Sequence, residues 1–355
     1  MSKFTSLKIK DIIRETSDAV TVVFEKPSAP EFQYQAGQYL TLKVDLGGES
    51  LRRAYSLCSS PLVDADLAVT VKSVKDGRVS RFVNEQLQSG QTLEVFPPMG
   101  NFKVVPEATR SHHYVLLGGG SGITPLMSIL KTVLKAESGC KVTLIYGNRD
   151  EQSIIFKKAL DELESAYPDR LKVVHILAES GPSWTGLTGV PHRSMLLGLV
   201  QDLLTMDRTP KSYWICGPTG MMEEAQAALA FLGIPKEIIH REVFTAAQPD
   251  PEAKAAAANV AAKKGSYSVK VTLDGVSKEV FVKENATILD AVIDAGMDPP
   301  FACQMGVCCT CRAKLVTGKV QMDEDEGLSD TEISQGYILT CQAHPLTPDC
   351  ELEYM

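Results

Sequence analysis

The sequence has no run approaching the ~18 consecutive apolar residues that a membrane-spanning helix needs. Its first 18 residues carry charges where a secretory signal peptide would have its apolar core. It also lacks an excess of positive charge, with 36 basic against 44 acidic residues, so it does not have the balance of a general nucleic-acid binder. These absences predict a cytoplasmic protein that binds neither membrane nor nucleic acid.

Catalytic side-chain sets are missing too, because no Ser-His-Asp set and no pair of catalytic carboxylates stands out. What remains is an ordinary globular composition, 44% hydrophobic and 23% charged, with 355 residues that suffice for two or three domains. The acidic charge is uneven, since residues 267–355 hold 6 basic and 15 acidic residues. The last quarter is therefore predicted to be a separate acidic unit.

Strand and helix patterns divide the chain into four parts. Short β-branched and aromatic runs between turns, at residues 19–25, 39–44, 67–74 and 92–96, predict the strands of a small antiparallel barrel over residues 1–107. Strands alternating with helices predict a parallel α/β sheet over residues 108–244. Residues 245–266 have no apolar face and are predicted to be a linker. In residues 267–355, a hairpin turning at Asp274-Gly275, a helix, a cysteine loop and two closing strands predict a compact α+β unit.

The nine cysteines are poor candidates for disulfides, because the cytoplasm keeps thiols reduced. Cys303, Cys308 and Cys311 are spaced C-x4-C-x2-C, and Cys341 follows after 29 residues. This three-plus-one pattern is that of plant-type [2Fe–2S] sites, whereas zinc sites usually have two separated CxxC pairs. Zinc is the alternative, and Cys309 leaves open a second register, Cys303-x5-Cys309-x1-Cys311.

The segments PFACQMGVCCTC and YILTCQAHP resemble the two ligand segments of plant-type ferredoxins. The resemblance covers residues 267–355 and implies a β-grasp fold with a [2Fe–2S] cluster held by Cys303, Cys308, Cys311 and Cys341. Cys309 departs from that family, which usually has a small residue without a thiol there.

Near the N-terminus, Arg53-Ala54-Tyr55-Ser56 combines a cation for a phosphate, a ring for stacking and a hydroxyl for a polar edge. We expect this segment to close the second or third barrel strand. Together with AGQYL before it and PMGNF after it, the segment resembles the flavin barrel of the ferredoxin–NADP reductase family. The resemblance implies FAD, by analogy rather than FMN, bound by Arg53, Ala54, Tyr55, Ser56, Val71, Lys72, Gly77, Arg78, Val79 and Ser80, the last four opening a helix.

GGGSGITP, residues 118–125, follows a predicted strand and opens a predicted helix, which is the context of a dinucleotide loop. Its Thr-Pro ending departs from G-x-G-x-x-G and resembles the form in the reductase family. Cys216-Gly217-Pro218 and Glu242-x-Phe244 resemble the family elements that hold the nicotinamide and flank the flavin ring. The resemblance implies catalytic roles for Thr124, Cys216 and Glu242, and cofactor contacts from Gly119, Gly120, Gly122, Thr124, Asn148, Arg149, Cys216, Gly217, Pro218 and Phe244.

In its order of flavin barrel, nucleotide domain and ferredoxin, the chain resembles the reductase components of bacterial oxygenases, in particular those of phenylacetyl-CoA epoxidase and 3-ketosteroid 9α-hydroxylase. This implies electron transfer from NAD(P)H through FAD and a [2Fe–2S] cluster to a terminal oxygenase of aromatic, acyl-CoA or steroid catabolism. A free-standing reductase of soluble acceptors and a redox sensor are the alternatives. A sensor would need a DNA- or signal-binding element, and the sequence shows none.

Two charged segments predict the coenzyme preference and the docking surface for the partner. Arg149, after the second strand of the parallel sheet, predicts that NADPH is accepted at least as well as NADH, although Asp150 follows it directly. The run Asp323 to Glu326 is too dense for local neutralisation and is predicted to dock on a basic patch of the partner, or alternatively to be a solvated run. Packed thiols are predicted at Cys58, Cys140 and Cys350, and a solvated surface at His112 and His113.

Overall fold

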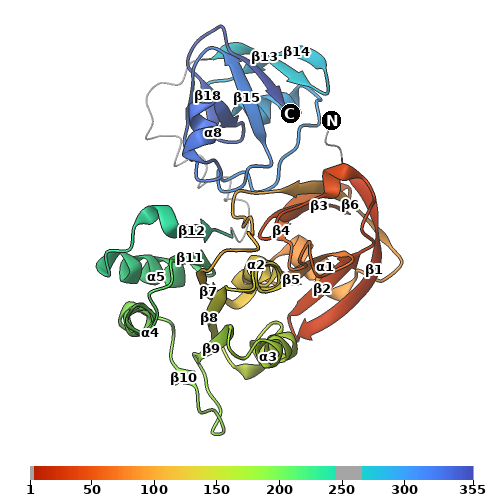
Figure 1. Ribbon diagram of the computed structural model, residues 1–355. Coiled ribbons are helices and arrows are strands. Elements are labelled where there is room, and N and C mark those ends of the chain that lie inside the picture. The colour runs from red at the N-terminus through yellow and green to blue at the C-terminus, as the bar shows by residue number, and fades with distance from the viewer. Residues whose placement is uncertain (1–3, 245–265, 355) are drawn as a thin grey trace.

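The computed structural model describes residues 4–244 and 266–354 (Figure 1). The predicted linker therefore lies outside the described residues, apart from Ser266. Within the described ranges, no helix is long and apolar enough to cross a membrane.

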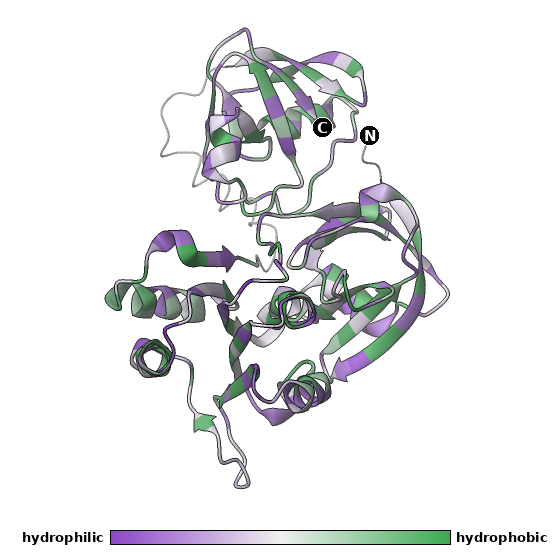
Figure 2. Cartoon of the chain, viewed as in Figure 1, coloured by the Kyte–Doolittle hydropathy of each residue, from purple (hydrophilic) through white to green (hydrophobic). Residues whose placement is uncertain are grey.

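The N-terminal part is a six-stranded antiparallel sheet with the order β4-β3-β6-β1-β2-β5. Its elements are β1 (Thr5–Thr16), β2 (Ala19–Phe24), β3 (Tyr39–Leu46), β4 (Glu49–Ser56), β5 (Leu67–Lys72), β6 (Thr92–Met99) and the helix α1 (Arg78–Glu85). Apolar and polar residues alternate along β3, whereas five of the six residues of β2 are buried. The apolar side chains of the strands form a shared core around Phe24, Leu42 and Val95 (Figure 2).

The sequence patterns predict β2, β3, β5 and β6 but not β1 or β4. Lysines and arginines interrupt β1, and two adjacent arginines stand in the middle of β4, so neither is a continuous β-branched run. As a result, Arg53 to Ser56 ends the fourth strand, and the prediction of the second or third strand is wrong.

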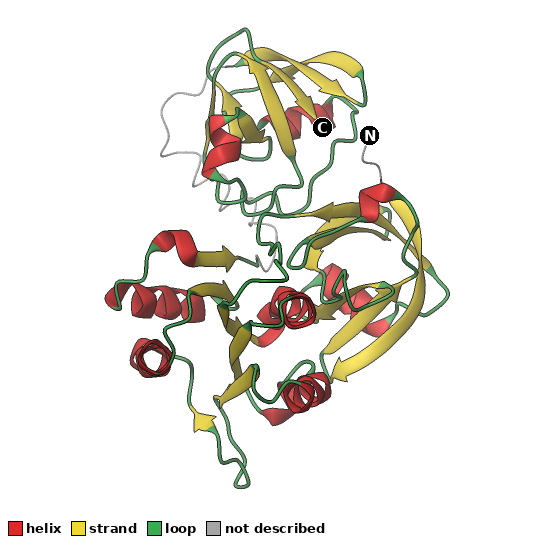
Figure 3. Cartoon of the chain, in the orientation of Figure 1, coloured by secondary structure: helices red, strands yellow, loops and turns green. Residues whose placement is uncertain are grey.

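The middle part is a parallel sheet with the order β10-β9-β8-β7-β11-β12 and helices on both faces (Figure 3). Its strands are β7 (His113–Gly119), β8 (Lys141–Asn148), β9 (Leu171–Leu177), β10 (Leu187–Thr188), β11 (Lys211–Cys216) and β12 (Ile239–Glu242). Its helices are α2 (Ile123–Ala136), α3 (Lys157–Ala166), α4 (Arg193–Met206) and α5 (Thr219–Phe231). All seven residues of β7 are buried, as expected of a central parallel strand.

The expected solvated position of His113 is wrong, because its side chain is 4% exposed in β7. Its ring nitrogens lie 3.1 Å from the Asp207 carboxylate and 2.9 Å from the Thr143 hydroxyl. Burial lowers the pKa of His113, which favours the neutral ring in this site. The three thiols predicted to be packed, Cys58, Cys140 and Cys350, are buried.

The C-terminal part has a five-stranded sheet with the order β14-β13-β19-β15-β17 and a separate pair, β16-β18. Its elements are β13 (Tyr267–Leu273), β14 (Val276–Val282), α7 (Ile288–Asp294), β15 (Arg312–Thr317), β16 (Val320–Met322), α8 (Asp330–Ser334), β17 (Tyr337–Leu339), β18 (Ala343–Pro345) and β19 (Glu351–Tyr354). The predicted hairpin turn is confirmed, with φ of 53° at Asp274 and 78° at Gly275. This unit lies against β3, β4 and β6 of the barrel and near β12 (Figure 1).

Candidate functional site

The carboxyl edge of the parallel sheet brings together two of the predicted catalytic residues. Cys216 at the end of β11 is in register with Gly118 of β7 on one side and with Glu242 of β12 on the other. Ligands of open parallel sheets bind outside this edge, where successive loops diverge. The register therefore places the Gly-rich loop, Cys216 and Glu242 side by side.

Close backbone packing explains the glycines at this edge. A Cβ atom at Gly122 would lie 2.0 Å from the carbonyl oxygen of Cys216, and one at Gly119 would lie 2.7 Å from Pro218. A Cβ atom at Gly217 would lie 3.0 Å from the Gly119 nitrogen. The two loops can touch only because neither carries side chains at these points.

At the start of α2, the predicted threonine is part of the Gly-rich turn. The Thr124 hydroxyl donates a hydrogen bond to the Ser121 carbonyl at 3.0 Å, and the side chain is 2% exposed. Gly120 has a left-handed φ of 52°, and Lys72 Nζ lies 4.0 Å from the position of a Cβ there. Thr124 thus fixes the turn, and Lys72 of the barrel reaches the loop.

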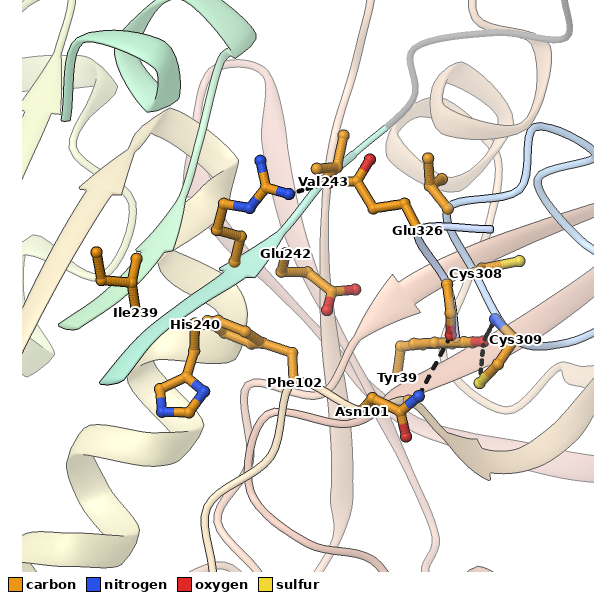
Figure 4. A pocket seen from close by; sticks show the side chains of 14 residues that line it. Tyr39, Asn101, Phe102, Ile239, His240, Glu242, Val243, Cys308, Cys309 and Glu326 are labelled. Carbon is orange, nitrogen blue, oxygen red and sulfur yellow. Dashed lines mark hydrogen bonds and ion pairs between the residues drawn. The ribbon is translucent and has the colours of Figure 1, made fainter. Parts of the chain in front are cut away.

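Burial controls the protonation of the two groups at the strand ends. It raises the pKa of the Cys216 thiol well above its usual value, and the Glu242 carboxylate adds to this effect. Burial, with Cys308 and Glu326 nearby, raises the pKa of Glu242 to about 8. Glu242 therefore keeps its proton to a higher pH than an ordinary carboxyl group does, and Figure 4 shows its side chain extending from β12 into a cavity.

In the barrel, the predicted flavin segment leaves one polar atom without a partner. The Ser56 side chain is 3% exposed, and its hydroxyl oxygen has no hydrogen-bond partner. Arg53 donates to the Arg52 carbonyl at 2.7 Å and is half-buried. An orphaned buried hydroxyl is costly unless a ligand satisfies it, so Ser56 fits a bound polar ring edge.

The helix α1, which follows β5, carries three of the remaining residues that are predicted to contact the flavin. Gly77 caps α1, and Ser80 lies in its first turn beside the backbone nitrogen of Val74, at 3.3 Å. Arg78 instead pairs with Glu49 at 2.6 Å and donates to the Leu46 carbonyl. The guanidinium of Arg78 is thus engaged by the barrel's own surface.

At the end of β8, Asn148 is 8% exposed and both polar atoms of its amide are without partners. The next residue, Arg149, is exposed and forms an ion pair with Asp150 at 2.9 Å. Asn148 therefore fits a ligand that supplies both a donor and an acceptor. Phe244, the last described residue before the gap, is 38% exposed.

In the C-terminal unit, the four cysteines with the plant-type spacing come together as two pairs. Cys303 lies close enough to Cys308, and Cys311 close enough to Cys341, for each pair to shift the pKa values of its thiols. Among the described residues, no three His, Cys, Asp or Glu side chains are grouped so that they could hold one metal ion. The four thiols also interact across these pairs and so form one group, whose three-plus-one spacing is that of a two-iron cluster.

Cys308 and Cys309 point in different directions (Figure 4). The Cys309 thiol turns toward the barrel and lies 3.4 Å from the phenol oxygen of Tyr39. Cys308 instead contacts Cys303 and the hydroxyl of Thr310, the latter at 3.6 Å. This geometry favours the register with four and two intervening residues.

A cavity of about 230 Å³ joins all three parts of the chain. Its walls come from the barrel, from β12 and from the cysteine loop, and it is lined by Tyr39, Gly100, Asn101, Phe102, Ile239, His240, Arg241, Glu242, Val243, Val307, Cys308, Cys309, Glu326 and Gly327 (Figure 4). The end of the parallel sheet and the cysteine loop are thus opposite walls of one space.

Polar side chains of the barrel and of β12 hold the C-terminal unit against this cavity. Arg52 of β4 is 4% exposed and forms an ion pair with Asp298. Its guanidinium group also donates to the Pro299 carbonyl at 2.7 Å and lies 4.3 Å from the centre of the Phe301 ring. Asn101 donates to Glu332 at 2.7 Å. On the other side, Arg241 of β12 pairs with Glu326 at 2.8 Å.

One carboxylate of the acidic run is neutralised within the chain, which corrects the expectation that the run is too dense for local neutralisation. Glu326 pairs with Arg241, and the Asp323 carboxylate lies 2.9 Å from His344 Nε2. The run also packs on the cysteine loop, because the Gly327 N–H donates to the Gly306 carbonyl at 2.7 Å. A sequence pattern cannot reveal such pairs, since their partners are 85 and 21 residues away.

Comparisons with known proteins find three family models, which match the chain in the same order as its three main sheets. Family models match residues 6–104 as an oxidoreductase FAD-binding domain, residues 116–227 as an oxidoreductase NAD-binding domain and residues 271–346 as a 2Fe-2S iron-sulfur cluster binding domain. Over its whole length, the chain is 38% identical to a component of the 1,2-phenylacetyl-CoA epoxidase of Escherichia coli strain K12, and the match covers 98% of that component. The chain belongs to the family of oxygenase reductase components.

Another member, the ferredoxin reductase component of 3-ketosteroid-9-alpha-monooxygenase from Mycobacterium tuberculosis, is 40% identical over 98% of this chain and 95% of its own. The solved structure of phthalate dioxygenase reductase shares the fold, with a TM-score of 0.59 and 22% identity over 99% of this chain and 98% of that one. The chain is accordingly an NAD(P)H oxidoreductase with FAD, pyridine nucleotide and [2Fe–2S] domains.

Several residues that join the C-terminal unit to the barrel and to β12 have no sequence signal of their own. Arg52, Thr310 and Arg241 are separated from their contacts by long stretches of chain and do not stand out from neighbouring residues. Tyr39 lies within the AGQYL segment, but that motif gives no hint of a contact with the cysteine loop. Cys309 is the exception, because its departure from the ferredoxin pattern marks the place where the two domains meet.

Proposed function

We propose that the cavity between Glu242 and Cys308 is where electrons pass from the flavin site to the cluster site within this one chain. The observation that carries the proposal is that the carboxyl edge of the nucleotide sheet, the barrel and the cysteine loop line one space. Bound FAD would convert two-electron hydride transfer into single electrons, and a [2Fe–2S] cluster would carry them one at a time. The chain's own residues orient these groups and exclude water between them.

We assign the cluster ligands as Cys303, Cys308, Cys311 and Cys341, in two pairs. The paired contacts and the orientation of Cys309 toward the barrel support this assignment. For FAD, we propose Ser56 and Tyr55 beside the ring and Lys72 beside the Gly-rich loop, supported by the orphaned Ser56 hydroxyl and the approach of Lys72 to Gly120.

For the nicotinamide, we propose the position beside Cys216, where Gly119 and Gly217 remove side chains from the approach. Cys216 would orient the ring rather than act as a nucleophile, because burial keeps its thiol protonated. Glu242, on the adjacent strand, would hold a proton at the cavity wall. The test is the visible spectrum of the purified protein with its extracted flavin identified; absence of either the flavin bands or the cluster absorption would refute the proposal.

NADPH is expected to be accepted at least as well as NADH. Arg149 is exposed at the end of β8, where a cation can meet a 2′-phosphate, although Asp150 competes for it at 2.9 Å. Arg149→Met should therefore lower kcat/KM for NADPH more than for NADH. Steady-state kinetics with both coenzymes decide this, and a preference of the unaltered protein for NADH above about tenfold, or about 1.4 kcal/mol, would contradict it.

We propose that the partner is the terminal component of an oxygenase, because the relatives are reductase components of such enzymes. The partner's substrate class is that of aromatic, acyl-CoA or steroid catabolism. A free-standing reductase of soluble acceptors is the competing function. Deleting the gene distinguishes them: loss of an oxygenase activity in the host supports the first, and unchanged oxygenase activity supports the second.

Partner reduction is expected to slow as salt rises, since residues 267–355 are acidic and Glu324 and Asp325 are exposed. Charge steering weakens as the Debye length falls from its value of ~10 Å at 0.1 M salt. The variant Glu324→Gln/Asp325→Asn should reproduce part of this loss at low salt, whereas Glu326→Gln should disturb the internal contact with Arg241 instead. A partner rate that does not depend on salt would mean apolar docking.

A further inference from the structure

A chain of buried hydroxyl groups crosses from the barrel to the cysteine loop. The Tyr39 phenol oxygen on β3 accepts a hydrogen bond from the Cys309 backbone N–H at 3.1 Å and lies 3.1 Å from the Thr310 hydroxyl. The Thr310 hydroxyl in turn lies 3.6 Å from Cys308 Sγ. A second barrel hydroxyl, that of Thr41, is 3.3 Å from Thr310.

The proton positions along this chain follow from the ligand at its end. A thiolate bound to iron has no proton, so Cys308 can only accept a hydrogen bond, and the Thr310 hydroxyl must donate to it. The Thr310 oxygen then has lone pairs that accept the Tyr39 O–H. Tyr39 completes the sequence by accepting from the Cys309 amide, so every group donates in the same direction, toward the sulfur.

These hydroxyl groups are shielded from bulk solvent. Tyr39 is 3% exposed, and Thr41 and Thr310 are each 1% exposed. In such a site a hydrogen bond is electrostatically strong. The apolar neighbours Ala302 and Met99 pack around the same contact and keep it closed.

We propose that Tyr39 is a positioning residue that sets the reduction potential of the cluster by orienting the Thr310 hydroxyl toward Cys308. The proposal rests on the proposed [2Fe–2S] function and on Cys308 as a ligand. Hydrogen bonds to ligand sulfur stabilise the reduced cluster, which carries more negative charge, and so raise its potential. Because Tyr39 belongs to the barrel, the potential is highest when the cluster unit is docked beside the flavin, and docking itself favours acceptance of the electron.

The test is a redox titration of the full-length holoprotein, followed by the electron paramagnetic resonance signal of the reduced cluster. Tyr39→Phe and Thr310→Val should each lower the midpoint potential, with an expected loss of about tenfold in the flavin-to-cluster equilibrium constant, or about 59 mV for one electron. Thr310→Ser, which keeps the hydroxyl, should restore the potential of the unaltered protein. The double variant Tyr39→Phe/Thr310→Val should fall no lower than Thr310→Val alone, because the two groups act in series.

Tyr34→Phe is the matched control. Tyr34 is another buried barrel tyrosine, 9% exposed, whose hydroxyl donates to Ser59 at 2.9 Å and belongs to the barrel core rather than the domain contact. It should leave the potential unchanged. Iron content and the visible spectrum show which variants retain an intact cluster. If Tyr39→Phe loses its iron, the comparison of the midpoint potentials of Thr310→Val and Thr310→Ser tests the hydrogen bond to Cys308.

Three results would overturn the proposal in distinguishable ways. If the unaltered protein holds no reducible cluster, the proposed function itself fails. If Tyr39→Phe and Thr41→Val both keep their clusters and have the potential of Tyr34→Phe, the relay from the barrel is wrong. If Thr41→Val lowers the potential and Tyr39→Phe does not, the barrel donor is Thr41 and the assignment to Tyr39 is wrong.

Discussion

Cys308→Ser is expected to lose the cluster or shift its spectrum, whereas Cys309→Ser is expected to keep both iron and colour. The two thiols are adjacent in sequence and both are buried, at 7% and 3% exposure, so a difference between them cannot come from accessibility. The difference comes from the direction in which each thiol points. Cys308 contacts Cys303, and Cys309 faces the Tyr39 phenol at 3.4 Å.

Serine is the appropriate replacement, because it is close in size and its hydroxyl is a poor ligand for iron compared with a thiolate. Iron and sulfide content per chain, with the visible spectrum, measures the outcome. Cys350→Ser, another buried thiol in the same unit and outside the loop, is a control for nonspecific loss of stability. If Cys309→Ser loses the cluster and Cys308→Ser retains it, the loop uses the other register.

Gly122→Ala is expected to lower the rate of flavin reduction by NADPH by about two orders of magnitude, the scale of loss that follows a displacement of about 1 Å at a reacting centre. The added Cβ would lie 2.0 Å from the Cys216 carbonyl oxygen and 2.7 Å from the Gly217 nitrogen. Both atoms are backbone and cannot rotate away. The Gly-rich loop and the Cys216 loop must therefore move apart, which displaces the proposed nicotinamide position.

Gly220→Ala is the matched control, since a Cβ at Gly220, in the first turn of α5, meets nothing within 4 Å. It should reduce the flavin at the rate of the unaltered protein and be slightly more stable, because alanine is a better helix former. Stopped-flow absorbance at the flavin band measures both variants. Equal rates for Gly122→Ala and Gly220→Ala would show that the contact between the two loops does not position the nucleotide.

The sequence predicts most of this architecture where the signal is local. The alternation of strands and helices predicts the parallel sheet, and Asp274-Gly275 predicts a hairpin turn that requires two positive φ angles. The start of α3 differs from the sequence pattern, which predicts one helix over residues 154–166. The apolar residues before Lys157 continue the helical pattern, but Phe156 has a φ of 62°, so the chain turns there before the helix begins.

The parts that the sequence does not predict depend on contacts between domains. Arg52 is one of two adjacent arginines in a strand, yet it is buried against Asp298 and Phe301, almost 250 residues away. The acidic run is predicted to be a solvated or docking segment, whereas its last carboxylate pairs with Arg241. Such pairs are set by how complete domains pack, and no spacing rule within one segment contains that information.

Electrons must cross the shared cavity inside one molecule if the cavity is the path from flavin to cluster. Anaerobic stopped-flow mixing with NADPH, recorded at several protein concentrations, measures this directly at the flavin and cluster absorption bands. We expect flavin bleaching first and cluster bleaching second, with a cluster rate that does not depend on protein concentration and changes little with salt. Cluster reduction whose rate rises in proportion to protein concentration would mean transfer between molecules, and would contradict the assignment of the cavity as the internal path.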